Sequence, residues 1–130
     1  MSIHSKPKPS KKRSRNNLKA DAVMTLFCHE TSTIRNLTKR IQELDQKLKG
    51  EFVSFNRIVD SVEKENEQIR DLLLEPIVQT KRLEKVRCQQ QFDLARCFET
   101  EEQIRRLFEA RSDALSDIGR RQHELVKARC

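Results

Sequence analysis

Cysteine and histidine are the side chains here with the richest chemistry, and their spacing fits neither metal binding nor nucleophilic catalysis. The cysteines are Cys28, Cys88, Cys97 and Cys130, and the histidines are His4, His29 and His123. Structural zinc sites need ligand pairs such as C-x-x-C, which the sequence lacks. Cys88 and Cys97 are nine residues apart, which places them on opposite faces of one helix and prevents a disulfide between them. We therefore predict free thiols in a reducing compartment, ordinary histidines, and neither a metal nor another cofactor.

Carboxylates are plentiful, but their arrangement is that of a solvated helix surface. Acid-first pairs of opposite charge, four residues apart, occur at Glu43–Lys47, Asp45–Lys49, Glu101–Arg105, Glu102–Arg106 and Asp117–Arg121. No glycine-rich phosphate loop, nucleophile elbow, HExxH or EF-hand pattern is present. With two glycines in 130 residues, sheets with tight turns and Rossmann crossovers are also disfavoured. We expect no enzymatic activity and no small-molecule substrate.

The positive charge is concentrated at the N-terminus. The net charge is +7, residues 1–19 contain no acidic side chain, and the remaining residues are balanced. The basic residues of this segment are Lys6, Lys8, Lys11, Lys12, Arg13, Arg15 and Lys19. Dense like charge with two prolines predicts a disordered tail over 1–19. Its composition resembles that of nuclear import signals and suits salt-dependent contact with DNA, RNA or microtubules. Composition alone does not distinguish between these three polyanions. A solubilising tail without a partner is the alternative.

Two serines lie among these cations. Ser10 and Ser14 are candidate phosphorylation sites, because a phosphate there removes much of the local positive charge. The tail is polar and basic, so we expect no signal peptide, and no apolar run approaches the ~20 residues that span a bilayer.

A heptad pattern predicts a long helix over residues 33–75. With Ile34 at position a, all six a positions up to Ile69 are apolar, as are four of the six d positions. Position e adds Phe52 and Val59, so the stripe is wider than a two-stranded seam. We expect a short helix or apolar segment over 20–30 and a break at 31–33. Glu51 and Glu65 at d argue against a strict leucine zipper.

Pro76 predicts an interruption, because proline lacks an N–H group and clashes with the preceding turn. A second amphipathic helix is predicted over 77–128. It keeps the a positions, while its companion column moves from d to e at Leu94, Phe108 and Leu115. A hairpin and a bent, continuous rod both remain open. The predicted fold is all-α: an elongated coiled coil or helical bundle of two long helices.

The apolar stripes predict association with other helical proteins. Two helices cannot cover stripes this broad, so we expect a bundle of about four helices from two or more chains, as a homo- or hetero-oligomer. The predicted partner interface comprises Ile34, Leu37, Ile41, Leu44, Leu48, Phe52, Phe55, Ile58, Val59, Val62, Ile69, Leu72, Leu83, Leu94, Ile104, Phe108, Leu115, Ile118 and Leu125.

Tail and stripes together predict a non-enzymatic subunit of a multi-protein coiled-coil complex. We expect a nuclear, chromosome- or spindle-associated assembly of the kinetochore, chromatin or microtubule type that acts in cell division. This expectation rests on the general combination of a basic tail with a long helical rod, and not on any motif. The alternative is a cytoplasmic or cytoskeletal adaptor subunit of a trafficking or tethering complex, whose tail meets anionic lipid. A basic-zipper transcription factor fits less well, because Pro7 and Pro9 prevent a continuous basic helix.

Overall fold

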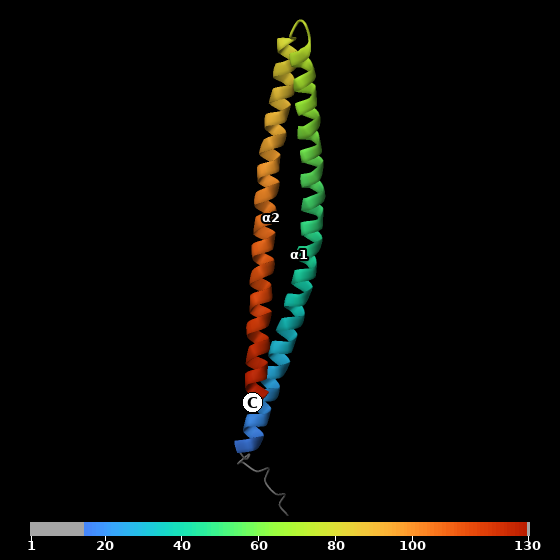
Figure 1. Cartoon of the computed structure of the whole chain (residues 1–130). Helices are drawn as coiled ribbons and strands as arrows, with labels where there is room; N and C mark the ends of the chain where they lie inside the picture. Colours follow the sequence, from blue (N-terminus) through green and yellow to red (C-terminus); the bar gives the residue numbers. More distant parts are fainter. Residues whose placement is uncertain (1–14, 130) are drawn as a thin grey trace, which may run out of the picture. The chain divides into compact units, whose positions relative to one another are not determined.

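The computed structural model describes residues 15–129 and is all-α over that range. Helix α1 spans Arg15–Leu74 and helix α2 spans Thr80–Arg129, with the segment 75–79 between them (Figure 1). The chain divides into two compact units. We call residues 40–114 the hairpin unit, and residues 15–39 with 115–129 the terminal unit, and we describe each by itself.

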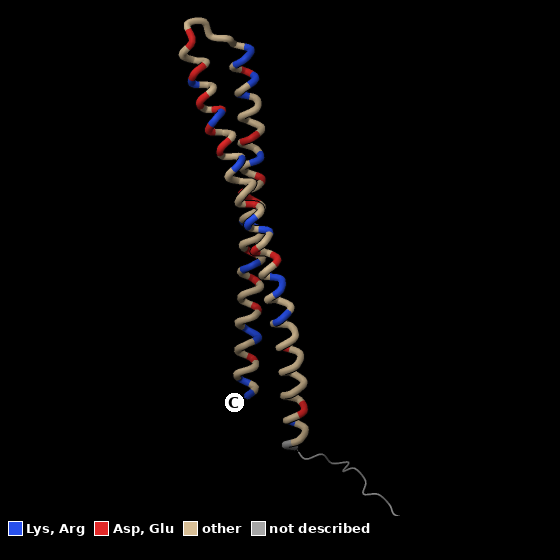
Figure 2. The backbone as a smooth tube through the Cα atoms, turned by 90° about the vertical axis from the view of Figure 1, so that its right-hand side faces the viewer, with Lys and Arg blue, Asp and Glu red and all other residues tan. Residues whose placement is uncertain are grey.

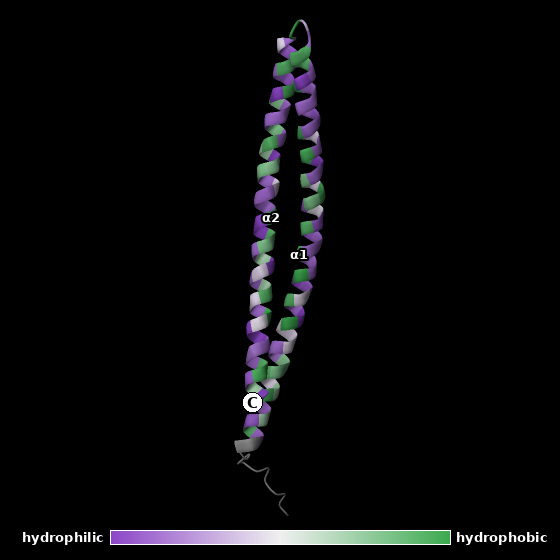
Figure 3. Ribbon diagram, in the orientation of Figure 1, coloured by the Kyte–Doolittle hydropathy of each residue, from purple (hydrophilic) through white to green (hydrophobic). Residues whose placement is uncertain are grey.

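In the hairpin unit the two helices run antiparallel and pack through the a and d positions of one continuous heptad register. The most buried apolar side chains are Leu44, Leu48, Ile58, Leu72, Leu83, Leu107 and Ala114. Leu44, Leu48 and Leu107 form a cluster that Ile104 and Ala110 extend. Hydrophobic residues accordingly recur along the whole length of both helices (Figure 3). The structure thus confirms two long helices with an apolar seam.

The connection is a hairpin turn, which decides between the two arrangements that Pro76 leaves open. Helix α1 ends at Leu74, two residues before the proline, as expected for a residue type that disfavours a helical predecessor. The carbonyl of Gln79 accepts the N–H of Leu83 at 3.0 Å, which is the first helical hydrogen bond of α2. The second helix therefore begins at Thr80, three residues later than predicted.

At the N-terminal side, the predicted boundaries differ from the structure. Helix α1 begins at Arg15, so residues 15–19 of the predicted tail are helical, and it runs through 31–33 without the predicted break. The hydroxyls of Thr25, Thr33 and Thr38 donate to the carbonyls four residues earlier, at 2.8–3.0 Å. These bonds satisfy the threonines inside the helix, so a Thr-Ser-Thr run does not need to end it.

The terminal unit packs by the same register. Phe27 lies at an a position, and the guanidinium of Arg129 lies 5.4 Å from its ring centroid, a cation–π contact. Val23, Met24, Phe27, Leu125, Ala128 and Arg129 line a small groove beside it. Extending the heptads back from Ile34 places Val23 at d and Phe27 at a, so one pattern accounts for the helix upstream of residue 31 as well.

Candidate interaction surface

Polar side chains interrupt the seam at several levels and define how the helices pair. In the terminal unit, one nitrogen of Arg121 donates to both carboxylate oxygens of Glu30 at 3.1 Å. Arg121 also lies 3.2 Å from Asp117 on its own helix. Glu30 is buried, and a buried carboxylate needs such a partner. This layer therefore favours one alignment of the two helices over its neighbours.

A second polar layer lies in the hairpin unit and pairs two carboxyl groups. Glu65 and Asp93, both at d positions, are buried at 7% and 5% exposure. Gln89 donates to Asp93 at 3.4 Å, and Arg96 lies 3.8 Å away. Glu65 Oε1 has no hydrogen-bond partner among the described residues. Burial, followed by the hydrogen bond and the charge of Asp93, raises the pKa of Glu65 to about 7.

Amide and ion-pair contacts cross one side of the same seam. Gln90 donates to the Val62 carbonyl at 3.4 Å and to the side-chain oxygen of Asn66. Arg111 pairs with Asp45 at 2.7 Å, so Asp45 has a partner across the hairpin. Gln90 and Arg111 are at a positions of α2, and their partners Asn66 and Asp45 are at e positions of α1. The contacts therefore identify the edge of the hairpin on which the e positions lie.

That edge carries a row of apolar side chains. Phe52 and Phe108, both at e, meet edge to face with ring centroids 6.1 Å apart. They remain 43% and 48% exposed. We define the apolar edge as Phe52, Val59, Leu73, Leu94, Phe98 and Phe108; all except the half-buried Val59 are exposed. Two grooves flank Phe108: an open one of about 740 Å³ lined by Phe98, Ile104 and Arg105 among others, and one lined by Gln42, Asp45 and Phe52 among others.

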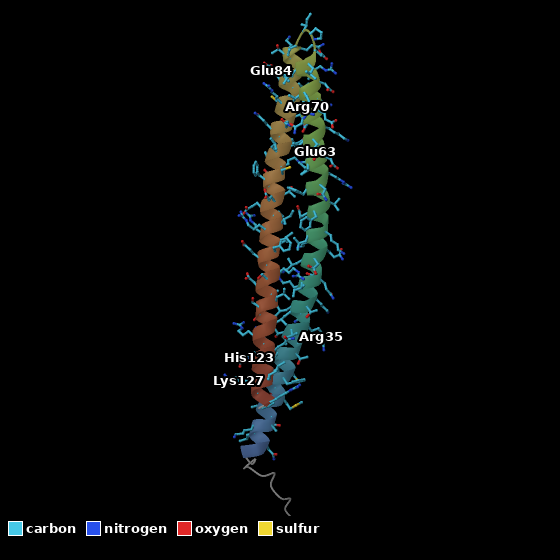
Figure 4. All side chains as sticks on the ribbon, in the orientation of Figure 1. Arg35, Glu63, Arg70, Glu84, His123 and Lys127 are labelled. Carbon is cyan, nitrogen blue, oxygen red and sulfur yellow. The ribbon has the colours of Figure 1, made fainter. Side chains whose placement is uncertain are left out.

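The opposite edge of the hairpin unit is polar. Its g positions are Arg40, Lys47, Ser54, Ser61, Gln68, Arg82, Gln89, Arg96, Gln103 and Ala110. The groove on this side is lined by Ser54, Arg57, Ile58, Ser61 and Arg96. Glu63, Arg70 and Glu84 are exposed too (Figure 4), but they are at b positions, next to the apolar edge. The large exposed apolar side chains of the apolar edge therefore have no counterpart at the g positions.

The structure divides the predicted partner interface into two sets. Most of its a and d members are buried or half-buried in the seam between α1 and α2: Ile34, Leu37, Ile41, Leu44, Leu48, Phe55, Ile58, Val62, Ile69, Leu72, Leu83, Ile104, Ile118 and Leu125. Phe52, Leu94, Phe108 and Leu115 are exposed instead, and Val59, also at an e position, is half-buried. The predicted shift of the α2 seam from d to e is wrong, because d positions such as Leu107 and Ala114 are the buried ones.

The sequence reasoning did not find the polar layers as sites. Glu65 enters the sequence analysis only as a poor fit to a zipper, and Asp93 does not enter it. Arg121 enters only as the partner of Asp117 on a solvated helix surface, which is wrong, because Arg121 is half-buried against Glu30. When the heptad register of α1 is continued into α2, Asp93 and Arg121 fall at d positions. This placement is the feature of the sequence that could have identified them as residues of the seam. The partner of each depends on the alignment across the hairpin, and that alignment comes only from the fold.

The described cysteines and histidines are distributed along both helices. Cys28 and Cys88 are exposed and Cys97 is half-buried; all three are free thiols. Burial, then the nearby charge of Asp93, raises the pKa of Cys97. His29 and His123 are exposed, His123 on α2 (Figure 4). Between residues 15 and 129, no three His, Cys, Asp or Glu side chains are placed to hold a metal ion.

Most of the predicted tail lies outside the described residues. This holds for Lys6, Lys8, Lys11, Lys12, Arg13, Ser10 and Ser14, as it does for His4 and Cys130. Arg15 and Lys19 belong to the first turns of α1, and Lys19 is exposed there. Neither described helix has a stretch long and apolar enough to cross a bilayer. Comparisons of the chain with protein-family models, curated proteins and solved structures gave no match.

Proposed function

We propose that this chain is a non-enzymatic helical subunit of a multi-protein coiled-coil assembly and that it binds further helices through its apolar edge. The observation that carries the proposal is the contrast between the two edges of the hairpin unit. Phe52 and Phe108 stand half-exposed among the apolar side chains of that edge, which they share with Asp45, Asn66, Arg87 and Glu101, while the g positions of the hairpin unit hold no apolar side chain larger than Ala110. Large apolar side chains exposed together along one edge are typical of sites that bind other proteins.

The geometry also supports the kind of partner. A row of apolar side chains along two antiparallel helices, with a groove on each side of Phe108, is complementary to another amphipathic helix or helix pair. Packing of this kind produces bundles of four helices, in which each helix covers two neighbours. The apolar edge is therefore the surface that a partner helix covers in this proposal.

A matched pair of substitutions tests the proposal in cells. Phe108 and Phe92 are both exposed phenylalanines on α2, but Phe92 occupies a c position away from the apolar edge. The tagged full chain, its Phe108→Lys variant and its Phe92→Lys variant are purified from cells that express the chain, and the bound proteins are identified and quantified. We expect coiled-coil proteins to be recovered with the parent and Phe92→Lys, and to be lost with Phe108→Lys. Equal recovery with all three would contradict the proposed surface.

The nuclear, chromosome- or spindle-associated location forms part of the proposal and is supported by the basic composition of residues 1–19. The cytoplasmic adaptor is the second candidate, and the same charge supports it, because anionic lipid also attracts polycations. Removing the basic residues that precede α1 separates the two without disturbing the helices.

A further inference from the structure

We infer that the hairpin unit contains a pH-sensitive switch: its two helices stay paired over residues 59–71 and 84–96 while Glu65 is protonated, and they separate there when Glu65 ionises. We call these two stretches the acid segment. Residues 40–55 with 101–114, which we call the cluster segment, stay paired in both states. The inference concerns the seam between the helices and does not depend on the proposed role of the apolar edge.

The acid segment buries little apolar surface. Its only buried residues are Glu65 and Asp93, at 7% and 5% exposure, and both are carboxylic acids. The apolar side chains at its a and d positions, Val62, Ile69 and Val86, are only half-buried. Burial of apolar surface is the main favourable contribution to helix pairing. Pairing in the acid segment therefore depends strongly on the state of the two acids.

The cluster segment is held more firmly across the two helices. It contains the apolar cluster of Leu44, Leu48 and Leu107, the ion pair of Arg111 with Asp45, and the aromatic contact of the apolar edge. In the acid segment, all of whose residues the structure describes, neither an ion pair nor a ring contact joins the helices. Local opening is easiest where few such contacts must break, so we expect it in the acid segment.

The charged groups around Glu65 favour its protonated form. Asp93 faces it from α2, and Arg96 lies 3.8 Å from Asp93, so Arg96 stabilises the charge of Asp93. Cys97 lies one turn further along α2, and burial and Asp93 raise the pKa of its thiol, which is therefore neutral near pH 7. The α1 positions three and four residues from Glu65 are uncharged. Residues 58–75 hold six acidic and two basic side chains, so acid predominates along α1 next to the turn (Figure 2).

Ionisation of Glu65 therefore favours the open state. An exposed glutamate titrates near 4.5, whereas burial, then the hydrogen bond and charge of Asp93, raises the pKa of Glu65 to about 7 in the closed state. Between these values the closed state keeps a proton that the open state releases, so each pH unit shifts the equilibrium by up to about tenfold towards opening. Above about 7 the equilibrium no longer changes. Glu65 Oε1, which has no hydrogen-bond partner among the described residues, gains water in the open state.

Amide hydrogen exchange of the full chain at pH 5.5 and pH 8, followed by mass spectrometry of peptic fragments, tests the inference. Protection is the ratio of the intrinsic to the observed exchange rate, which removes the intrinsic effect of pH. We expect the acid segment to be at least about tenfold less protected than the cluster segment at pH 8, and its protection to fall at least about tenfold from pH 5.5 to pH 8. Equal protection of the two segments, or no change with pH in the acid segment, overturns the inference.

Conservative substitutions assign the effect to the acid pair. Glu65→Gln removes the charge, so the fall in protection between the two pH values should disappear, and Asp93→Asn removes the facing charge and should reduce the fall. Glu51→Gln is the matched control, because Glu51 also occupies a d position of α1, two heptads earlier in the cluster segment. This control should keep the pH response of the parent chain. A fall that persists in Glu65→Gln, or that Glu51→Gln also removes, overturns the inference.

Discussion

Glu65 brings an ionisable group into an otherwise packed seam, and its environment favours the protonated form. The carboxyl group faces Asp93 across the hairpin. Gln89 donates a hydrogen bond to Asp93 and Arg96 forms an ion pair with it, so these two residues stabilise the charge of Asp93 and not that of Glu65. An unfolded glutamate titrates near 4.5, whereas in the folded chain the pKa of Glu65 is about 7. Between these values the folded chain retains a proton that the unfolded chain releases. Its stability therefore falls as the pH rises from about 4.5 to about 7, and this contribution is constant above that range.

Glu65→Gln tests that assignment. The amide has the same shape, carries no charge, and can donate to Asp93. We expect the variant to exceed the parent in unfolding free energy by about 1–3 kcal/mol at pH 8, and the two to converge near pH 5. Urea denaturation at both pH values, at one fixed protein concentration, gives the comparison. Glu67→Gln, on the exposed face of α1, is the control. Parallel pH profiles for parent and Glu65→Gln would show that Glu65 ionises freely.

Arg121 has the opposite role, since it neutralises a buried charge. Arg121→Leu leaves the Glu30 carboxylate buried without its bidentate partner. We expect a lower melting temperature, with a smaller loss of stability than for a fully buried pair, because a quarter of the Arg121 side chain remains exposed. The double variant Glu30→Leu/Arg121→Leu should recover most of this loss, since apolar side chains of similar volume can replace a buried ion pair. Thermal denaturation of both variants checks this, and a double variant no more stable than the single one speaks against it.

At the scale of the element, the a positions of both helices were predictable and the companion column was not. In α1 the large apolar residues occupy a and d, so the heptad count alone identifies the seam. In α2 the d positions include Asp93, Thr100 and Arg121, while Leu94 and Phe108 stand at e. Hydrophobicity therefore points to the wrong column. Arg121 is tolerated at d because Glu30 on α1 lies opposite it, and Asp93 is tolerated because Gln89 and Arg96 contact it. The pairing of Arg121 with Glu30 across the hairpin is not visible in one helix.

The break expected at 31–33 has a similar origin. Thr31-Ser32-Thr33 resembles a helix start by composition, and local composition takes no account of the register that Val23 and Phe27 continue. The hairpin at Pro76 was one of two open readings, because proline explains an interruption but not a change of direction. The seam of α2, opposite that of α1, supplies the reason: only a reversed chain lets both apolar stripes cover each other.

A proline substitution distinguishes a continuous α1 from a broken one. Ser32 is exposed in mid-helix. Ser32→Pro removes one helical hydrogen bond and clashes with the preceding turn, so we expect a loss of about 3 kcal/mol or more and a lower helical signal in far-ultraviolet circular dichroism. Ser32→Ala is the control and should change stability little. If the proline variant melts with the control, a break at 31–33 is present in solution.

At the scale of the whole molecule, charge is divided between a basic N-terminal segment and a balanced remainder. Residues 20–130 contain equal numbers of basic and acidic side chains, so the excess of +7 belongs to residues 1–19. A polyanion or an import receptor would therefore be recruited by the segment that precedes and begins α1, while the helices recruit other helices. Because the two activities use separate residues, each can be removed without the other.

Deletion of residues 2–14 tests this separation and the proposed location together. The deletion removes five of the seven basic residues and leaves α1 intact from Arg15. Fused to a reporter too large to diffuse through nuclear pores, the parent chain should accumulate in the nucleus, and the deletion should leave it in the cytoplasm. Replacing Lys11, Lys12 and Arg13 by glutamine should have the same effect, because it removes charge without shortening the chain. Both variants should still be recovered with the proteins that bind the apolar edge. Cytoplasmic puncta shared by parent and deletion would instead support the adaptor alternative, since the helices alone would then determine where the chain resides.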